Sequence, residues 1–149
     1  MAPIESIKQL REETGMSVTD VKNALKEAGG DEEKARQLLR SRGVEIAQKK
    51  QAREAGEGLV ETYLHPTGKT GVILDLRSET DFVAKSPDFK TLAHELVLQI
   101  AAMEPESVED LLGQAYIKDS AKTVDSFLKE YVARLGENIV VKRFERYQI

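Results

Sequence analysis

The segment LVETYLHPTGKTGVILDLR, residues 59–77, decides the fold because it changes the hydrophobic period of the chain. Its two ends, LVETYLH and TGVILDLR, are short runs rich in β-branched and other apolar residues, which is typical of strands. The four residues between them, PTGK, contain Pro and Gly and predict a turn. The sequence therefore predicts an antiparallel hairpin. Because a two-stranded sheet is only marginally stable in water, we expect a third strand elsewhere.

The third strand is predicted in the tail, NIVVKRFERYQI, which follows the helix-stopping Gly136. Two helices are predicted between the hairpin and the tail. Ser86 and Pro87 form an N-cap and N1 pair that opens the first, and the second runs from Val124 to Leu135 with the same apolar spacing. The connector between these helices is expected to contain one helical turn at 108–112. The predicted class is α+β, with two helices on one face of a three-stranded antiparallel sheet.

Before Gly56 the apolar residues recur at the spacing of α-helices, and three short helices are predicted. Gly15 ends the first helix. Ser17 and Asp31 are N-cap candidates for the second and third helices. Basic residues followed by Gly43 mark the end of the third. These helices are expected to form a small bundle.

A further helical segment, VEIAQKKQAREA, follows this bundle and has little apolar stripe. We therefore interpret it as a solvated linker helix between two folded parts. The predicted domains are a three-helix module at residues 1–43, a linker helix at 44–56 and an α+β core at 57–149.

Composition excludes several classes of protein. The chain has 149 residues, a net charge of −4 and no cysteine, so it has neither disulfides nor thiolate metal sites. No apolar run approaches the roughly 20 residues that a membrane span requires, and the N-terminus lacks the apolar region of a secretory signal. We therefore expect a cytoplasmic protein without a membrane partner. Neither half is strongly basic, which argues against direct nucleic acid binding.

The sequence contains no pattern typical of a catalytic or metal site. Its two histidines, His65 and His94, lie far apart in the chain, and neither has a His partner at metal-ligand spacing. The glycine-rich phosphate-binding motifs and the nucleophile elbow are absent. Adjacent carboxylates such as Glu12 and Glu13 do not converge on one helix face. We predict no catalytic residue, no metal, no cofactor and no enzymatic activity.

The connection between the hairpin and the next helix, SETDFVAKSPDF, places the aromatic Phe82 directly after Asp81. Two interpretations are open. In the first, which the residues alone favour, Phe82 or Val83 packs beneath the sheet while Thr80 or Asp81 caps a helical turn. In the second, Phe82 projects as an aromatic anchor with Asp81 beside it, a composition typical of binding hot spots.

Four segments of the chain, in this order, resemble the elongation factor Ts family, the guanine nucleotide exchange factors for elongation factor Tu. They are IKQLREETGMSVTDVKNALKEAGGDEEKARQLLRSRG, AREAGEGLVETYL, ETDFVAK and LGENIVVKRF, and together they cover well over half of the residues. The resemblance implies an N-terminal three-helix module similar to ubiquitin-associated (UBA) domains, a linker helix and an α+β core. The core here is short, because longer members carry a second copy of it or a helical insertion after the segment that matches AAMEPE.

The resemblance also implies a function and the residues that carry it. The chain is expected to bind elongation factor Tu with GDP and to promote GDP release, after which GTP binds. In the family the TDFV loop, here Thr80, Asp81, Phe82 and Val83, inserts near the Mg²⁺ of the partner. The aromatic ring wedges between side chains there, and the resulting rearrangement displaces the ion.

Secondary contacts with the partner are implied for three residues of the N-terminal module, Arg11, Val18 and Thr19. Thr19 departs from the apolar residue that family members often carry there. Because a sheet covered on one face leaves the other face open, a two-fold homodimer is a further hypothesis.

Two other functions remain open. The first is a UBA-type adaptor without exchange activity, which captures a small folded protein through the loop TGM at 14–16. The second is an RNA-contacting accessory protein that uses bases of the linker and the tail, namely Lys49, Lys50, Arg53, Lys142, Arg143 and Arg146.

Overall fold

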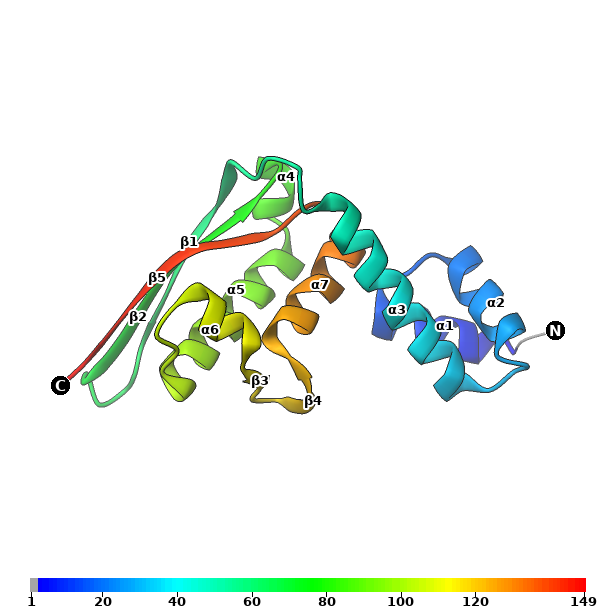
Figure 1. The fold of residues 1–149 in the computed structure, drawn as a ribbon, viewed down its shortest axis with the longest axis horizontal. Helices are drawn as coiled ribbons and strands as arrows, with labels where there is room; N and C mark the ends of the chain where they lie inside the picture. The colour runs from blue at the N-terminus through cyan, green and yellow to red at the C-terminus, as the bar shows by residue number, and fades with distance from the viewer. Residues whose placement is uncertain (1–2) are drawn as a thin grey trace.

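The computed structural model describes residues 3–149 and places helices and strands along their whole length (Figure 1). The first two residues of the predicted N-terminal module lie outside the described residues. The elements, in chain order, are α1 (Ile4–Thr14), α2 (Val18–Glu27), α3 (Glu32–Lys50), β1 (Glu57–Leu64), β2 (Thr70–Ser78), α4 (Asp81–Ala84), α5 (Pro87–Met103), α6 (Val108–Gly113), β3 (Ala115–Tyr116), β4 (Asp119–Thr123), α7 (Val124–Leu135) and β5 (Val140–Gln148).

Three strands form one antiparallel sheet in the order β1, β2, β5. The predicted turn joins β1 to β2, and the tail pairs along the other side of β2, so the predicted third strand is confirmed. Successive side chains of a strand point to opposite faces. On β2, Val72, Leu74 and Leu76 are therefore buried, whereas Ile73 between them is 46% exposed.

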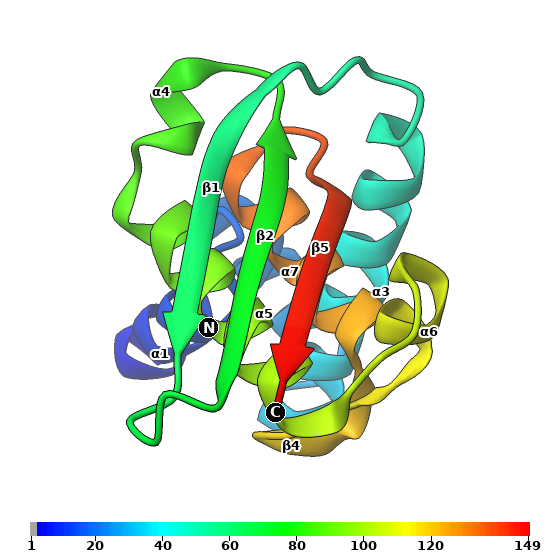
Figure 2. The same ribbon diagram turned by 90° about the vertical axis from the view of Figure 1, so that its left-hand side faces the viewer.

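Helices cover one face of this sheet. α5 packs against β1 and β2, α6 lies against β5, and α7 packs beside α5 (Figure 1). Figure 2 views the sheet from its other side, where no element of residues 3–149 lies in front of the strands. The predicted α+β class is therefore confirmed. The core between sheet and helices is mainly apolar, and its fully buried side chains include Leu74, Leu76, Phe89, Leu92, Leu96 and Ile100.

The connector between α5 and α7 holds more structure than the sequence predicted. The expected helical turn is present as α6, but a short hairpin of β3 and β4 follows it. Gln99 of α5 is fully buried and supports this hairpin: its Nε2 donates to the carbonyl oxygen of Ala115 (3.0 Å), and its Oε1 accepts from the N–H of Ile117 (2.9 Å). The strands AY and DSAKT are short and mostly polar, which is why their sequence gave no strand signal.

The second and third N-terminal helices begin at their predicted N-caps, and the first ends at its predicted glycine. The side chain of Ser17 accepts from the N–H of Asp20 (3.1 Å), and that of Asp31 accepts from the N–H of Glu33 (3.0 Å). Gly15 ends α1 in the left-handed conformation, with φ of 69°. These helices share a small core of their own, formed by Leu10, Met16, Val21, Ala24, Leu25, Ala35 and Leu39. None of the helices in residues 3–149 is long and apolar enough to cross a membrane.

The predicted end of the third helix at Gly43 is wrong, because α3 continues through it to Lys50. The linker is also less solvated than expected: Ala47 belongs to the core beneath the sheet, and Ile46 packs on the N-terminal core. A Cβ on Gly43 would lie 3.4 Å from that of Ala133 on α7. Small residues thus let α3 approach α7 closely, and such a contact produces no apolar stripe. The division of the chain at residues 43 and 56 stays a prediction.

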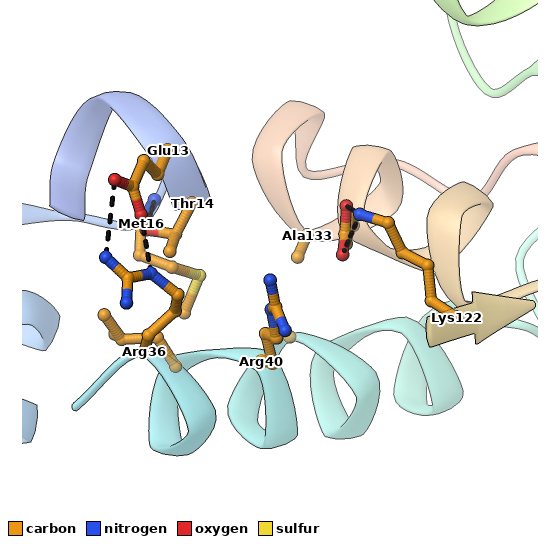
Figure 3. Close-up of a pocket in the computed structure, with 10 residues that line it drawn as sticks. Glu13, Thr14, Met16, Arg36, Arg40, Lys122 and Ala133 are labelled. Atoms are coloured by element: carbon orange, nitrogen blue, oxygen red, sulfur yellow. Dashed lines mark hydrogen bonds and ion pairs between the residues drawn. The ribbon is translucent and has the colours of Figure 1, made fainter. Parts of the chain in front are cut away.

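Ion pairs flank the place where the N-terminal helices meet the core. Arg36 of α3 bonds to Glu13 of α1 through its Nε (2.7 Å) and holds the pKa of that carboxyl below its usual value. Lys122 of β4 bonds to Glu130 of α7 (3.0 Å). Figure 3 shows Arg40 pointing into the space between these pairs, where a cavity of about 80 Å³ remains. The N-terminal helices and the core are therefore joined by close packing of α3 on α7, with charged groups around this contact.

Candidate functional site

The bend between β2 and α5 contains α4, a helix of a single turn. Thr80 is its N-cap, and the Oγ1 of Thr80 accepts a hydrogen bond from the N–H of Val83 (3.2 Å). A second cap follows at once, because the Oγ of Ser86 accepts from the N–H of Phe89 at the start of α5 (3.2 Å). The two N-caps thus separate α4 from α5 as two distinct helices. The short helix α4 lies at one end of the sheet (Figure 1).

One side of α4 is buried and the other is exposed. Val83 and Ala84 are 6% and 3% exposed and belong to the main core, whereas the side chain of Phe82 is 85% exposed. Each of the two interpretations of this segment is therefore correct in part. Thr80 caps a helical turn and Val83 packs inward, as in the first interpretation, while Phe82 projects outward, as in the second.

Two charged residues flank the exposed ring. Asp81 and Lys85, one turn apart, form an ion pair with a distance of 2.9 Å between Oδ2 and Nζ. The hydrogen bond to Asp81 raises the pKa of Lys85 above its ordinary value. Both side chains are mainly exposed, so the pair adds little to stability. The outer surface of α4 therefore offers an aromatic ring beside a compensated pair of charges, an arrangement suited to binding.

A residue without a role in the sequence analysis contacts this bend. Glu137 lies just after α7, and its carboxylate accepts hydrogen bonds from the backbone N–H groups of Glu79 (3.1 Å) and Thr80 (2.9 Å). It also accepts one from the Oγ1 of Thr80 (2.7 Å). The sequence signal was weak: Glu137 follows the helix-stopping Gly136 within the segment LGENIVVKRF, but its bonding partners lie 57 and 58 residues earlier in the chain.

The three residues expected to make secondary contacts lie apart from α4. Arg11, Val18 and Thr19 are all exposed, Val18 to 39%, near the end of α1 and the start of α2. Figure 1 shows these two helices at the opposite end of the long axis from the sheet. The structure therefore presents two separate surfaces, and a partner must be large to reach both.

The residues behind the RNA alternative do not form one surface in the tail. Arg146 turns toward the helices, where its Nη2 donates to the carbonyl oxygen of Ala101 (3.0 Å). Arg143 lies on the open face of the sheet, with its Nε 3.4 Å from Oδ2 of Asp75. Because β5 sends these bases to opposite faces and each contacts an acceptor within the chain, the tail offers no continuous basic stripe.

Comparison with known proteins connects this geometry to a family. The sequence model described as Elongation factor TS matches residues 79–149, a range that begins at the bend and includes both α4 and Glu137. Several curated proteins that match are named Elongation factor Ts. The one from Coprothermobacter proteolyticus is 39% identical over 188 aligned positions, which cover 96% of this chain and 95% of that protein.

Two further relatives differ in length. The Elongation factor Ts of Rubrobacter xylanophilus is 38% identical over 191 positions, which cover 98% of both chains. That alignment is longer than this chain, so the relative carries residues without a counterpart here. The Elongation factor Ts of Clostridium kluyveri is 44% identical over 149 positions, which cover all of this chain and 49% of the relative. This chain is therefore shorter than both relatives, and that the missing residues belong to the core stays a prediction.

The opposite placements of Phe82 and Val83 predict opposite effects of truncation. Phe82→Ala should change the free energy of unfolding by less than about 0.5 kcal/mol, because the ring is exposed. Val83→Ala should lower it by about 1–3 kcal/mol, because buried methyl groups are lost from the core. Urea unfolding followed by circular dichroism measures both. Equal destabilisation by the two substitutions would show that the ring is packed against the protein.

Proposed function

The chain belongs to the elongation factor Ts family of translation elongation factors, and from this premise we propose that it is a guanine nucleotide exchange factor for elongation factor Tu. It binds the GDP-bound partner in the cytoplasm, promotes GDP release and so allows GTP to bind. The reaction makes and breaks no covalent bond, so the factor is not an enzyme in the chemical sense. The observation that carries the proposal is the 85% exposure of Phe82 on a helix whose other side is buried.

The ring of Phe82 supplies the binding energy that drives exchange. Transfer of a phenylalanine side chain from water into an apolar environment yields about 1.5–3 kcal/mol. If this energy is gained mainly when the partner has rearranged, it lowers the barrier to GDP release, and about 1.4 kcal/mol corresponds to a factor of ten in rate. One ring therefore accounts for an acceleration between about 10-fold and 100-fold.

The rearrangement acts through the metal ion of the partner. A GTPase holds its nucleotide partly through Mg²⁺, which bridges phosphate oxygens and is positioned by nearby protein groups. Insertion of Phe82 between side chains near this ion displaces those groups, and the ion leaves. Thr80 caps the helix, Asp81 makes polar contacts with the partner and Val83 anchors α4 in the core. All four residues of the TDFV segment therefore contribute to exchange.

Release of the factor follows from thermodynamic linkage. If the factor weakens GDP binding to the partner, then GDP or GTP weakens binding of the factor by the same ratio. Nucleotide rebinding therefore expels the factor, which can act on the next partner molecule. The N-terminal module contacts the partner's nucleotide-binding domain through Arg11, Val18 and Thr19, at a distance from the Phe82 ring.

The exchange proposal predicts a large effect of one exposed ring. The intact protein should accelerate release of a fluorescent GDP analogue from elongation factor Tu, and Phe82→Ala should reduce the second-order rate constant of this acceleration at least about tenfold. Stopped-flow fluorescence measures both rates.

Met103→Ala is a suitable control for this experiment, because Met103 is another exposed apolar side chain, 45% exposed, at the far end of α5. It should leave exchange unchanged. An intact protein without any effect on GDP release, or a Phe82→Ala variant with full activity, would contradict the proposed function.

We also propose that two copies of the chain associate through the open face of the sheet. This face exposes Val60 (65%), Ile73 (46%) and Tyr147 (73%), and beside them Asp75 accepts a hydrogen bond from Arg77 (2.6 Å). A surface with an apolar centre and charges of both signs can be complementary to itself about a two-fold axis. The Clostridium kluyveri relative has about twice the length of this chain, which supports the idea that two short chains replace one long chain.

The dimer proposal predicts twice the chain mass in sedimentation equilibrium at micromolar concentration. Val60→Glu should shift the protein to monomer, because it buries a carboxylate in the apolar centre of the interface. Ile117→Glu is the control, because Ile117 is 41% exposed but lies between β3 and β4, outside the three-stranded sheet. It should leave the dimer intact. A monomer for the intact protein would remove this proposal.

A further inference from the structure

Two short segments far apart in the chain hold each other at the base of α4. Residues 79–80 lead into the helix, and residues 137–138 lie in the connection from α7 to β5. The carboxylate of Glu137 accepts from the backbone of the first segment, and the carboxylate of Glu79 accepts from the N–H of Asn138 (2.6 Å). Each segment therefore provides a carboxylate for the backbone of the other, which fixes their relative position.

We propose that Glu137 is a positioning residue for exchange, which sets the direction of the Phe82 ring by holding the N-terminus of α4. The inference rests on the proposed function in that Phe82 is the group that acts on the partner. Glu137 itself acts through the helix and does not need to touch the partner.

The hydrogen bonds of Glu137 determine how Thr80 caps the helix. A hydroxyl group has one proton to donate and two lone pairs that accept. The Oγ1 of Thr80 donates its proton to Oε2 of Glu137 (2.7 Å), which leaves its lone pairs free for the N–H of Val83 (3.2 Å). Bonds to a carboxylate are stronger than bonds between neutral groups. Glu137 thus fixes both the position and the orientation of the cap.

A helix as short as α4 depends on such external contacts. Isolated helices of one turn are unstable in water, and the first N–H groups of a helix lack partners within it. Val83 and Ala84 attach the inner side of α4 to the core. The N-terminal end, which carries Phe82, is held by Thr80 and, through it, by Glu137. Loss of Glu137 therefore frees the end that bears the ring and leaves the buried end in place.

The position of Glu137 is itself fixed on both sides. Gly136 adopts a left-handed conformation, with φ of 76°, and ends α7 so that the chain turns toward the bend. Asn138 is 5% exposed, and its Nδ2 donates to the carbonyl oxygen of Arg53 (2.7 Å), in the segment between α3 and β1. The Nη1 of Arg53 in turn lies 3.8 Å from Oε1 of Glu79. We call the mutual hydrogen bonds of residues 79–80 and 137–138 the clasp. Because the segment between α3 and β1 also bonds to it, the clasp is rigid enough to set the direction of a short helix.

A direct test measures the motion of the side chain at position 82 without any partner. The chain contains no tryptophan, so Phe82→Trp introduces a single indole fluorophore. Time-resolved anisotropy should show larger nanosecond motion of this indole when Glu137→Ala is added, and an intermediate amplitude for Glu137→Gln, which keeps one acceptor oxygen. Unchanged motion in the Glu137→Ala variant would overturn the inference, whatever the outcome of exchange assays.

A double-mutant cycle then tests whether Glu137 acts through Phe82. Glu137→Ala should slow stimulated GDP release by about threefold to tenfold, the factor that corresponds to ordering one side chain on binding. In the Phe82→Ala background the same substitution should have almost no further effect, because the ring that it positions is absent. A purely structural role predicts equal factors in both backgrounds, and that result would overturn the inference.

Glu95→Ala provides a matched control. Glu95 on α5 also accepts charge-assisted and neutral hydrogen bonds, from Lys118 (2.6 Å) and from the hydroxyl of Tyr116 (3.2 Å), but it does so beside the β3–β4 hairpin. It should leave exchange unchanged at a temperature where the variant is folded, and a loss equal to that of Glu137→Ala would overturn the inference. Absence of stimulation by the intact protein would instead contradict the proposed function and leave the anisotropy result to decide the role of Glu137.

Discussion

Consecutive side chains of an α-helix point about 100° apart, so a helix of one turn cannot direct all of its side chains into the core. This constraint determines the geometry of the bend. Val83 and Ala84 enter the core beneath the sheet, and the helix cannot rotate without exposing them. Phe82 is therefore forced into solvent, where its ring is 85% exposed. The core of the protein thus supplies the energy that keeps an apolar side chain on the surface.

The packing that stabilises α4 also holds the Phe82 ring in one direction before any partner binds. An aromatic side chain that is already directed outward loses little conformational entropy when a partner encloses it, so more of the burial energy is available for binding. The clasp between residues 79–80 and 137–138 contributes to this order without occupying the exposed surface. In the proposed function, this binding energy acts against the ion-held nucleotide of the partner.

Local patterns predicted most of the fold, and long-range contacts account for what they did not predict. The hairpin, the helix caps at Ser17, Asp31 and Ser86, and the end of α7 follow from neighbouring residues. The continuity of α3 does not, because it depends on the approach of Gly43 to α7. The direction of Phe82 depends on which side of α4 meets the core, and the role of Glu137 depends on bonds across more than 50 residues of sequence. No short-range signal encodes either.

The central claim is that the ring of Phe82 enters elongation factor Tu, and site-specific photo-crosslinking tests it most directly. With p-benzoylphenylalanine in place of Phe82, irradiation should link the chain to nucleotide-free elongation factor Tu, and the yield should fall as GDP is added, because the two ligands weaken each other. The same group at Met103, an apolar side chain at the end of α5 that is 45% exposed, should give no such link. Equal yields at both positions, or no link at position 82 while the intact protein still accelerates GDP release, would contradict the account.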